Sequence, residues 1–178
     1  QSAGFTHWAK LNNLKQAAKT MNFLIEHGIS SYGELESKLA VISTRRDTVH
    51  AEIKRVESRS TELALVMKHA GTYRQLKPLY VRYRKSNDKE KFLRGHESEI
   101  ILFEAVAREL KRLGAVPLPT TESMKTELTN LAAEKERLLA EYKAARTEAQ
   151  EYETVKQNVD ALLTVPKEQE QQRRHELE

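Results

Sequence analysis

The chain has 178 residues, of which 39% are hydrophobic and 31% are charged, and its net charge is +4. This balance is typical of long helices with narrow apolar faces and disfavours a deep globular core. The absence of cysteine excludes disulfides and thiolate metal sites. No apolar run approaches the roughly 18 residues of a membrane span, so we expect no membrane insertion.

Glycine and serine residues mark the end of the first predicted segment, residues 1–30. A helix is expected over residues 6–27, with Gly28 as a left-handed residue at its C-terminus. Ser31 and Glu34 then form a capping box that opens the next helix. The apolar face of the first helix consists of Trp8, Leu11, Leu14 or Lys15, Ala18, Met21 and Ile25, with Phe5 and Phe23 beside it.

The longest predicted helix spans residues 120–163, where apolar residues recur at alternating spacings of four and three. This 3.5-residue period indicates a helix that buries a narrow seam against a partner helix. At about 1.5 Å per residue it would be roughly 65 Å long. Lys135 and Lys156 occupy two register positions. The others are Met124, Leu128, Leu131, Leu138, Tyr142, Ala145, Ala149, Tyr152, Val159 and Leu163.

A second helix keeps the same period over residues 31–70, and its register stops at Gly71. Arg46 and Ser60 are its polar register positions. Its seam residues are Leu35, Leu39, Ile42, Val49, Ile53, Val56, Leu63, Met67 and Ala70. Two long helices with one thin seam each are the simplest partners for each other. We therefore predict an all-α fold with a long antiparallel coiled-coil hairpin of residues 31–70 and 120–163.

The register of this hairpin makes a specific prediction about charge. If Ala70 lies near Met124, Arg46 lies near Glu148, and Ser60 lies near Glu134. We expect Arg46 to contact a carboxylate across the seam.

Residues 71–119 are predicted to form a small helical head at one end of the hairpin, with the N-terminal helix buttressing the other end. A helical segment over 72–86 has Pro78 as a kink or first turn. A short turn over 90–94 ends near Gly95, and a helix over 97–113 ends at Gly114. The apolar side of this last helix comprises Ile100, Ile101, Phe103, Ala107 and Leu110. A proline-containing connector then leads to Thr120 or Thr121 as the cap of the long helix.

The polar residues 164–178 form a predicted tail, either an added helix or a frayed end. The absence of Met at the start suggests a piece of a longer protein.

Basic residues are concentrated between residues 72 and 94, where eight Lys and Arg oppose only Asp88 and Glu90. This segment has a net charge of +6, so the rest of the chain carries −2. Lys and Arg neutralise phosphates, and aromatic rings stack on unpaired bases. The alternative is a solvated helix face with tyrosines packed beneath it. The candidate nucleic-acid-binding residues are Arg74, Lys77, Tyr80, Arg82, Tyr83, Arg84, Lys85, Lys89, Lys91 and Arg94.

The six histidines are scattered, without the spacing of metal ligands, so we predict neither a metal site nor a cofactor. His27, at a helix end, is expected to serve as a C-terminal charge or a polar cap. The sequence contains no phosphate loop, no nucleophile–base pair and no spaced carboxylate cluster, so we predict no catalytic residue.

An ordered series of segments resembles the C-terminal region of relaxases, the mobilisation nucleases of conjugative transposons and related mobile elements. The segments span nearly the whole chain. They are residues 4–10 (GFTHWAK), 13–24 (NLKQAAKTMNFL), 81–85 (VRYRK), 91–94 (KFLR), 96–100 (HESEI), 118–120 (LPT), 133–142 (AEKERLLAEY) and 158–163 (NVDALL).

The resemblance implies a parent protein with a DNA-nicking domain that precedes this region and uses a Tyr nucleophile and a His-bound divalent metal. None of that chemistry maps onto the present residues. The implied function is a non-catalytic accessory domain in bacterial cytoplasm that binds transfer-origin DNA, duplex or single-stranded, and assists relaxosome assembly. The alternative is a coiled-coil module that docks relaxosome accessory proteins or the coupling protein without contacting DNA. Self-association of the rod, into a homodimer or a four-helix arrangement, is a third alternative.

Overall fold

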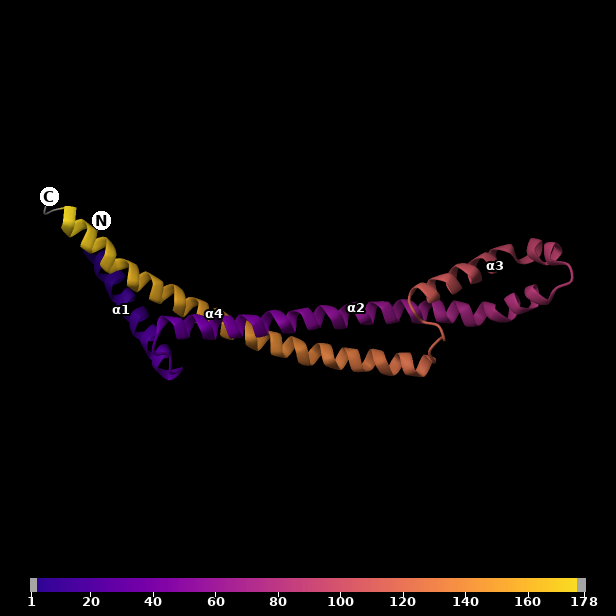
Figure 1. Cartoon of the computed structure of the whole chain (residues 1–178), viewed down its shortest axis with the longest axis horizontal. Helices are drawn as coiled ribbons and strands as arrows, with labels where there is room; N and C mark the ends of the chain where they lie inside the picture. The colour runs from indigo at the N-terminus through magenta and orange to yellow at the C-terminus, as the bar shows by residue number, and fades with distance from the viewer. Residues whose placement is uncertain (1–2, 176–178) are drawn as a thin grey trace. The chain divides into compact units, whose positions relative to one another are not determined.

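The computed structural model describes the backbone of residues 3–175 and the side chains of residues 12–164. These residues form four helices and no strand: α1 (Ala3–Glu26), α2 (Tyr32–Lys85), α3 (Lys89–Arg112) and α4 (Thr121–His175) (Figure 1). The predicted all-α class is confirmed. Over the described part of the chain, no helix combines the length and the apolar character of a membrane span.

The chain divides into two compact units. Unit 1 contains residues 1–50 and 140–178, and unit 2 contains residues 51–139. Because α2 and α4 are long, each of them contributes to both units.

Unit 1 has its core where α1, the start of α2 and the second part of α4 meet. Ile29, Leu35, Tyr152 and Val155 form the buried cluster. The ring of Phe23 stands edge-on to that of Tyr152, with the centroids 5.0 Å apart. Aromatic pairs of this geometry contribute about 0.5–1.5 kcal/mol beyond the area they bury.

The turn between α1 and α2 contains the predicted caps. Gly28 has a φ of 61°. The Ser31 hydroxyl accepts a hydrogen bond from the Glu34 N–H at 3.2 Å. The Glu34 carboxylate accepts one from the Ser30 N–H at 2.7 Å, which lowers the pKa of Glu34. The capping box is therefore present, but the backbone N–H that donates to the Glu34 carboxylate belongs to Ser30 rather than to Ser31.

His27 occupies the predicted position at the end of α1. Its Nδ1 lies 2.9 Å from the Phe23 carbonyl oxygen, to which Nδ1–H can donate. Its ring stacks on that of Phe23, with a centroid distance of 3.9 Å. Both contacts fit the expected role of a polar cap.

The prediction for the buried face of α1 is wrong over the described residues. Leu14, Ala18, Met21 and Ile25 are exposed, and α1 packs through Thr20, Phe23 and Leu24 instead. The cause is a polar contact: Asn158 of α4 donates to the Thr20 hydroxyl at 3.1 Å and accepts from the Gln16 amide at 2.7 Å. The side chains of Phe5, Trp8 and Leu11 lie outside the described residues.

The seam of α2 is buried or half-buried at all nine predicted apolar positions, and that of α4 at every position except Leu163, which is exposed. Leu163 does not end the helix either, because α4 continues to His175. Val66 and Val155 are buried although they fall outside the predicted register.

The two lysines in the seam of α4 each reach a carboxylate of α2. In unit 2, Lys135 Nζ lies 2.8 Å from Glu57 Oε1. In unit 1, Lys156 Nζ lies 3.9 Å from Glu36 Oε1. Hydrogen bonding to Tyr32 and Asp160 raises the pKa of Lys156 to about 12, so this ammonium stays charged. Long stems and paired charges explain how lysine fits a narrow apolar seam.

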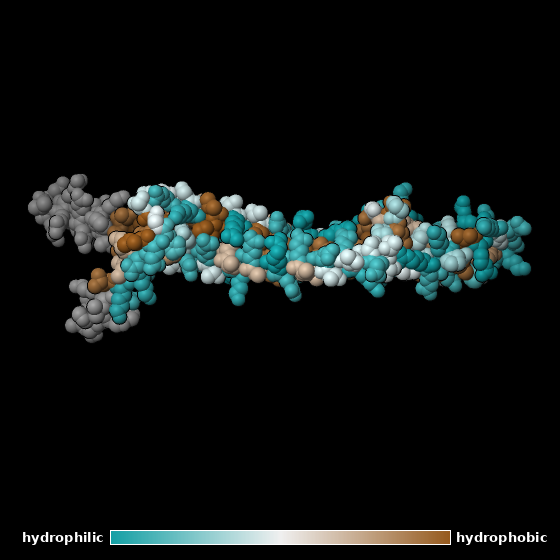
Figure 2. Space-filling model, turned by 90° about the horizontal axis from the view of Figure 1, so that it is seen from below, coloured by the Kyte–Doolittle hydropathy of each residue, from teal (hydrophilic) through white to brown (hydrophobic). Residues whose placement is uncertain are grey.

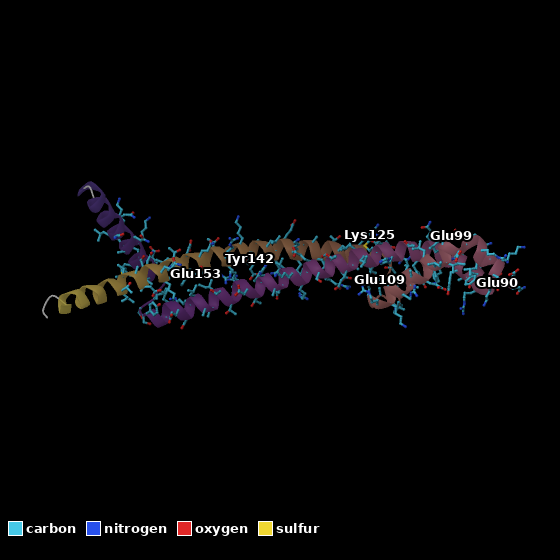
Figure 3. The ribbon with its side chains drawn as sticks, turned by 90° about the horizontal axis from the view of Figure 1, so that it is seen from above. Glu90, Glu99, Glu109, Lys125, Tyr142 and Glu153 are labelled. Atoms are coloured by element: carbon cyan, nitrogen blue, oxygen red, sulfur yellow. The ribbon has the colours of Figure 1, made fainter. Side chains whose placement is uncertain are left out.

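Arg46 contacts a carboxylate of α4, as predicted, but the partner is different. Its Nη1 lies 3.5 Å from Glu153 Oε1, whereas Glu148 was expected. Figure 3 labels Glu153 and Tyr142 on α4. Tyr142 is half-buried and stacks on His50, with the ring centroids 5.3 Å apart.

Unit 2 has a three-helix core. Its buried residues come from α2, α3, α4 and the connector between α3 and α4: Leu63, Val66, Ala70, Val106, Leu110, Ala115 and Met124. Figure 1 shows α3 folded back along the second part of α2. On α3, Ile101 is exposed and Val106 is buried, so the predicted apolar side is correct only in part.

The predicted break at Gly71, between the helix over residues 31–70 and the head over residues 71–119, is not observed. α2 runs through Gly71 and Pro78 and ends at Lys85. Tyr73 and Tyr80 stack on Phe103 of α3. Because these contacts lie on both sides of Pro78, packing supports a helix that local propensity disfavours.

Two predicted breaks in the head are confirmed. Within α3, His96 has non-helical angles (φ −141°, ψ 27°), next to Gly95. Gly114 has a φ of 68° after the end of α3. The Thr120 hydroxyl then accepts from the Ser123 N–H at 3.1 Å, so Thr120 caps α4.

Replacing Gly71 with Ala should raise the free energy of unfolding by about 0.5–1 kcal/mol, because alanine is the better helix former. A Cβ at Gly71 would meet no atom within 4 Å. The matched control is Gly114→Ala, which should destabilise by about 1 kcal/mol because the φ of Gly114 is positive. Urea unfolding followed by circular dichroism measures both. Equal losses for the two variants would contradict a continuous α2.

Candidate nucleic-acid interface

The end of α2 and the start of α3 bring six basic residues together across a short turn. Asp88 caps α3, because its Oδ1 accepts from the Lys91 N–H at 2.9 Å. Ser86 Oγ donates to the Asp88 carbonyl oxygen at 3.0 Å. This tight turn fixes the two helix ends beside each other. We call the six residues the basic cluster: Arg82, Arg84, Lys85, Lys89, Lys91 and Arg94.

All six side chains of the basic cluster are exposed. Within the described residues, none of them forms an ion pair or a side-chain hydrogen bond, and Arg82 lies over the ring of Phe92 at 5.9 Å. Figure 3 shows side chains projecting outward around Glu90, at the start of α3. On the face seen in Figure 2, the surface of this part of unit 2 is mostly hydrophilic. These cations are therefore available to an anionic ligand.

Helix dipoles act differently on the three cluster residues at the end of α2 and on the two in the first turn of α3. Arg82, Arg84 and Lys85 occupy the last turn of α2, where the dipole favours cations. Lys89 and Lys91 lie in the first turn of α3, where the dipole disfavours them. The local structure thus accounts for the first group. At the start of α3, Asp88 and Glu90 already place two carboxylates beside Lys89 and Lys91 in the sequence.

Arg74 and Lys77, the other predicted basic site residues, lie apart from the cluster along α2. The Arg74 guanidinium donates to Thr121 Oγ1 and to the Pro119 carbonyl oxygen, both at 2.7 Å. It thereby joins α2 to the start of α4. Lys77 Nζ lies 5.6 Å from the centroid of the Tyr73 ring. Arg74 consequently has a structural role in unit 2.

The predicted site tyrosines are part of an aromatic column between α2 and α3. Tyr80 stacks on Phe103 with a centroid distance of 4.3 Å, and its hydroxyl donates to Glu104 at 3.2 Å. Burial, together with the charge of Glu104, raises the pKa of Tyr80. Tyr83 and Phe92 are half-buried, with centroids 6.1 Å apart. These rings hold α3 against α2 and offer little free face for stacking on bases.

The sequence reasoning missed the role of Phe103 as the partner of two tyrosines. Tyr73 stacks on the ring of Phe103 at 4.9 Å and Tyr80 does so at 4.3 Å. A signal was present, since Tyr73 and Tyr80 are seven residues apart and therefore share one face of α2.

A shallow concavity of about 280 Å³ lies at the turn, lined in part by Lys91, Phe92 and His96. His96 Nδ1 has no hydrogen-bond partner, and its nearest carboxylate, that of Glu99, is 3.7 Å away. Over the described residues, no three His, Asp or Glu side chains are placed to hold a metal ion. The arrangement offers cationic contacts to an anion.

No family model matches this chain, and no curated protein or solved structure shows significant similarity to it.

Proposed function

We propose that this chain is a non-catalytic C-terminal accessory region of a conjugative-element relaxase that binds transfer-origin DNA and assists relaxosome assembly. Two observations support the proposal: the ordered sequence resemblance, and the six exposed, unpaired cations of the basic cluster. The parent protein would be a DNA-nicking transesterase of bacterial cytoplasm. In this region α2 and α4 would form an antiparallel coiled-coil arm, which the seam burial in each unit supports.

The basic cluster is expected to contact phosphates rather than bases. Its cations are exposed, whereas Tyr80, Tyr83 and Phe92 are half-buried in the aromatic column. Phosphate contacts position a protein on DNA but carry no direct sequence information. We therefore expect duplex DNA to bind at least as tightly as a single strand of equal length, with little dependence on sequence.

The second candidate function is a protein-interaction module that docks accessory or coupling proteins without touching DNA. The position of Arg82, Arg84 and Lys85 favours it, because the end of α2 is a place where cations stabilise a helix without any ligand. The two candidates differ in one measurable property, namely affinity for DNA.

Replacing Arg82, Arg84 and Lys85 together with Ala should weaken binding to transfer-origin duplex about 100-fold at low salt. Each lost phosphate contact removes the release of about one counterion. The slope of log K against log salt should become shallower by about 2–3 for the same reason. Fluorescence anisotropy with labelled duplex and single strands, over a salt series, measures both quantities.

The matched control removes three exposed cations elsewhere, by Lys125→Ala, Lys143→Ala and Arg146→Ala. Net charge falls equally, so an equal loss of affinity would indicate a diffuse charge effect and not a site. Absence of DNA affinity at low salt, or an unchanged affinity in the cluster variant, would reject the DNA function and favour the protein-interaction module.

A further inference from the structure

The exposed face of α1 is an apolar stripe with coiled-coil spacing. Leu14, Met21 and Ile25 are 68%, 59% and 69% exposed, and Ala18 between them is also exposed. Their spacings of four, three and four place all four side chains on one side of the helix. Large apolar side chains are seldom left exposed in a contiguous row unless they contact a partner.

Among the residues whose side chains are described, the packing of unit 1 leaves the stripe uncovered, because α1 uses its opposite side there. Gln16, Thr20 and Phe23 face α4 through the hydrogen bonds to Asn158 and the contact with Tyr152. On a helix of 3.6 residues per turn these three residues lie nearly opposite the stripe. Rotating α1 to bury the stripe would break the polar contacts.

The stripe is complementary to itself in an antiparallel arrangement. If Leu14 faces Ile25 of a second copy, Ala18 faces Met21, so each large side chain in the middle meets a small one. Two-fold symmetry gives each of these contacts twice: two between Leu14 and Ile25, and two between Ala18 and Met21. An isologous interface requires this repetition.

The charges beside the stripe fit the same arrangement. Lys15 and Glu26 are exposed and lie on the same flank of α1. When two copies pair antiparallel, this flank meets its own counterpart, and Lys15 of each copy comes close to Glu26 of the other. Lys19 is exposed on the same flank and lies opposite its own copy near the two-fold axis, so two Lys15–Glu26 contacts stand against one pair of like charges. A second copy of this chain therefore matches Lys15 and Glu26 together.

We propose that two copies of this chain associate through the α1 stripe as an antiparallel helix pair. This surface is separate from the basic cluster, so the proposal is independent of DNA binding. The contact is small, since about four residues of each copy take part. We therefore expect a reversible dimer with a dissociation constant on the order of 10–100 µM.

Cysteine cross-linking of the full chain tests the pairing, because the sequence contains no native cysteine. A mixture of the Leu14→Cys and Ile25→Cys variants should give a disulfide-linked dimer on mild oxidation. Neither variant alone should do so, because its two thiols would be separated by 11 residues of helix, about 16 Å. Disulfides need Cα atoms within about 7 Å. Val41→Cys, at a position that is also 69% exposed, is the control for random collision.

Sedimentation velocity of variants without cysteine provides the second measurement. Met21→Glu should weaken the dimer at least tenfold, whereas Val41→Glu should leave it unchanged. Lys15→Glu should weaken it as well, and adding Glu26→Lys to Lys15→Glu should restore it, because the charge pair is then reversed rather than removed. All of these positions are exposed, so the helix content should be unchanged.

Three results would overturn the proposal. Efficient cross-linking of Leu14→Cys alone would indicate a parallel pair. A chain that remains monomeric at several hundred micromolar, with cross-linking no better than for Val41→Cys, would exclude self-association through α1. A monomer that binds vesicles of anionic phospholipid, and loses this binding on Met21→Glu, would assign the stripe to a membrane surface.

Discussion

Replacing Phe103 with Ala should lower the free energy of unfolding of unit 2 by about 4 kcal/mol, within the 3–5 kcal/mol range for buried phenylalanine. Phe103 is 6% exposed, and its ring stacks on both Tyr73 and Tyr80. Truncation therefore leaves a cavity and removes two aromatic pairs. Hydrogen exchange of the α3 amides measures the loss.

Ile101→Ala is the matched control for Phe103, since Ile101 lies two residues earlier on α3 and is 56% exposed. It should change stability by no more than about 0.5 kcal/mol. A similar loss in both variants would contradict the packing of α3 through Phe103.

Replacing Leu110 with Ala should cost about 3 kcal/mol, within the range of 2–5 kcal/mol for buried leucine. Leu110 is 2% exposed and belongs to the cluster that includes Leu63 of α2 and Met124 of α4. The truncation therefore weakens contacts of three helices at once. Urea unfolding followed by circular dichroism measures the loss.

Leu102→Ala removes the same atoms from a leucine of α3 that is 47% exposed, and it should have little effect. Leu110→Met, which preserves volume, should cost less than about 1.5 kcal/mol. If Leu110→Ala and Leu102→Ala were equally mild, the three-helix core of unit 2 would be wrong.

The seams of α2 and α4 were predictable because a 3.5-residue period leaves one continuous apolar row on an otherwise charged helix. The row from Leu35 to Ala70 is buried or half-buried throughout. The caps at Gly28 and Thr120 were predictable for a similar reason, since their chemistry depends on residues within one turn. Both signals are local in sequence.

The extent of α2 could not be predicted in this way. Gly71 and Pro78 are local signals for a break, and they were outweighed by the stacking of Tyr73 and Tyr80 on Phe103. These contacts join residues more than twenty positions apart, so no local pattern reveals them. Tertiary packing overrides helix propensity when it contributes more free energy than one lost hydrogen bond costs.

The candidate site also has features that are visible in the sequence and features that depend on tertiary packing. The sequence located the run of basic residues, because composition along the chain is directly visible. Only the structure separated Arg74, whose guanidinium donates to Thr121 and Pro119, from the six cations of the basic cluster, which form no such side-chain hydrogen bond within the described residues. It also placed Tyr80 and Tyr83 in the aromatic column between α2 and α3. The charge of a side chain can be seen in the sequence, whereas its freedom to contact a ligand depends on the residues that pack around it.

The sequence by itself determined that the chain is helical, where its narrow apolar seams lie and where its positive charge is concentrated. Tertiary structure decided which face of α1 is covered: hydrogen bonds of Asn158 with Gln16 and Thr20 hold that face against α4 and leave Leu14 and Met21 exposed. Periodicity identifies a face that is apolar, but it cannot tell whether a partner covers that face. That depends on whether distant polar groups satisfy one another, which only the folded chain determines.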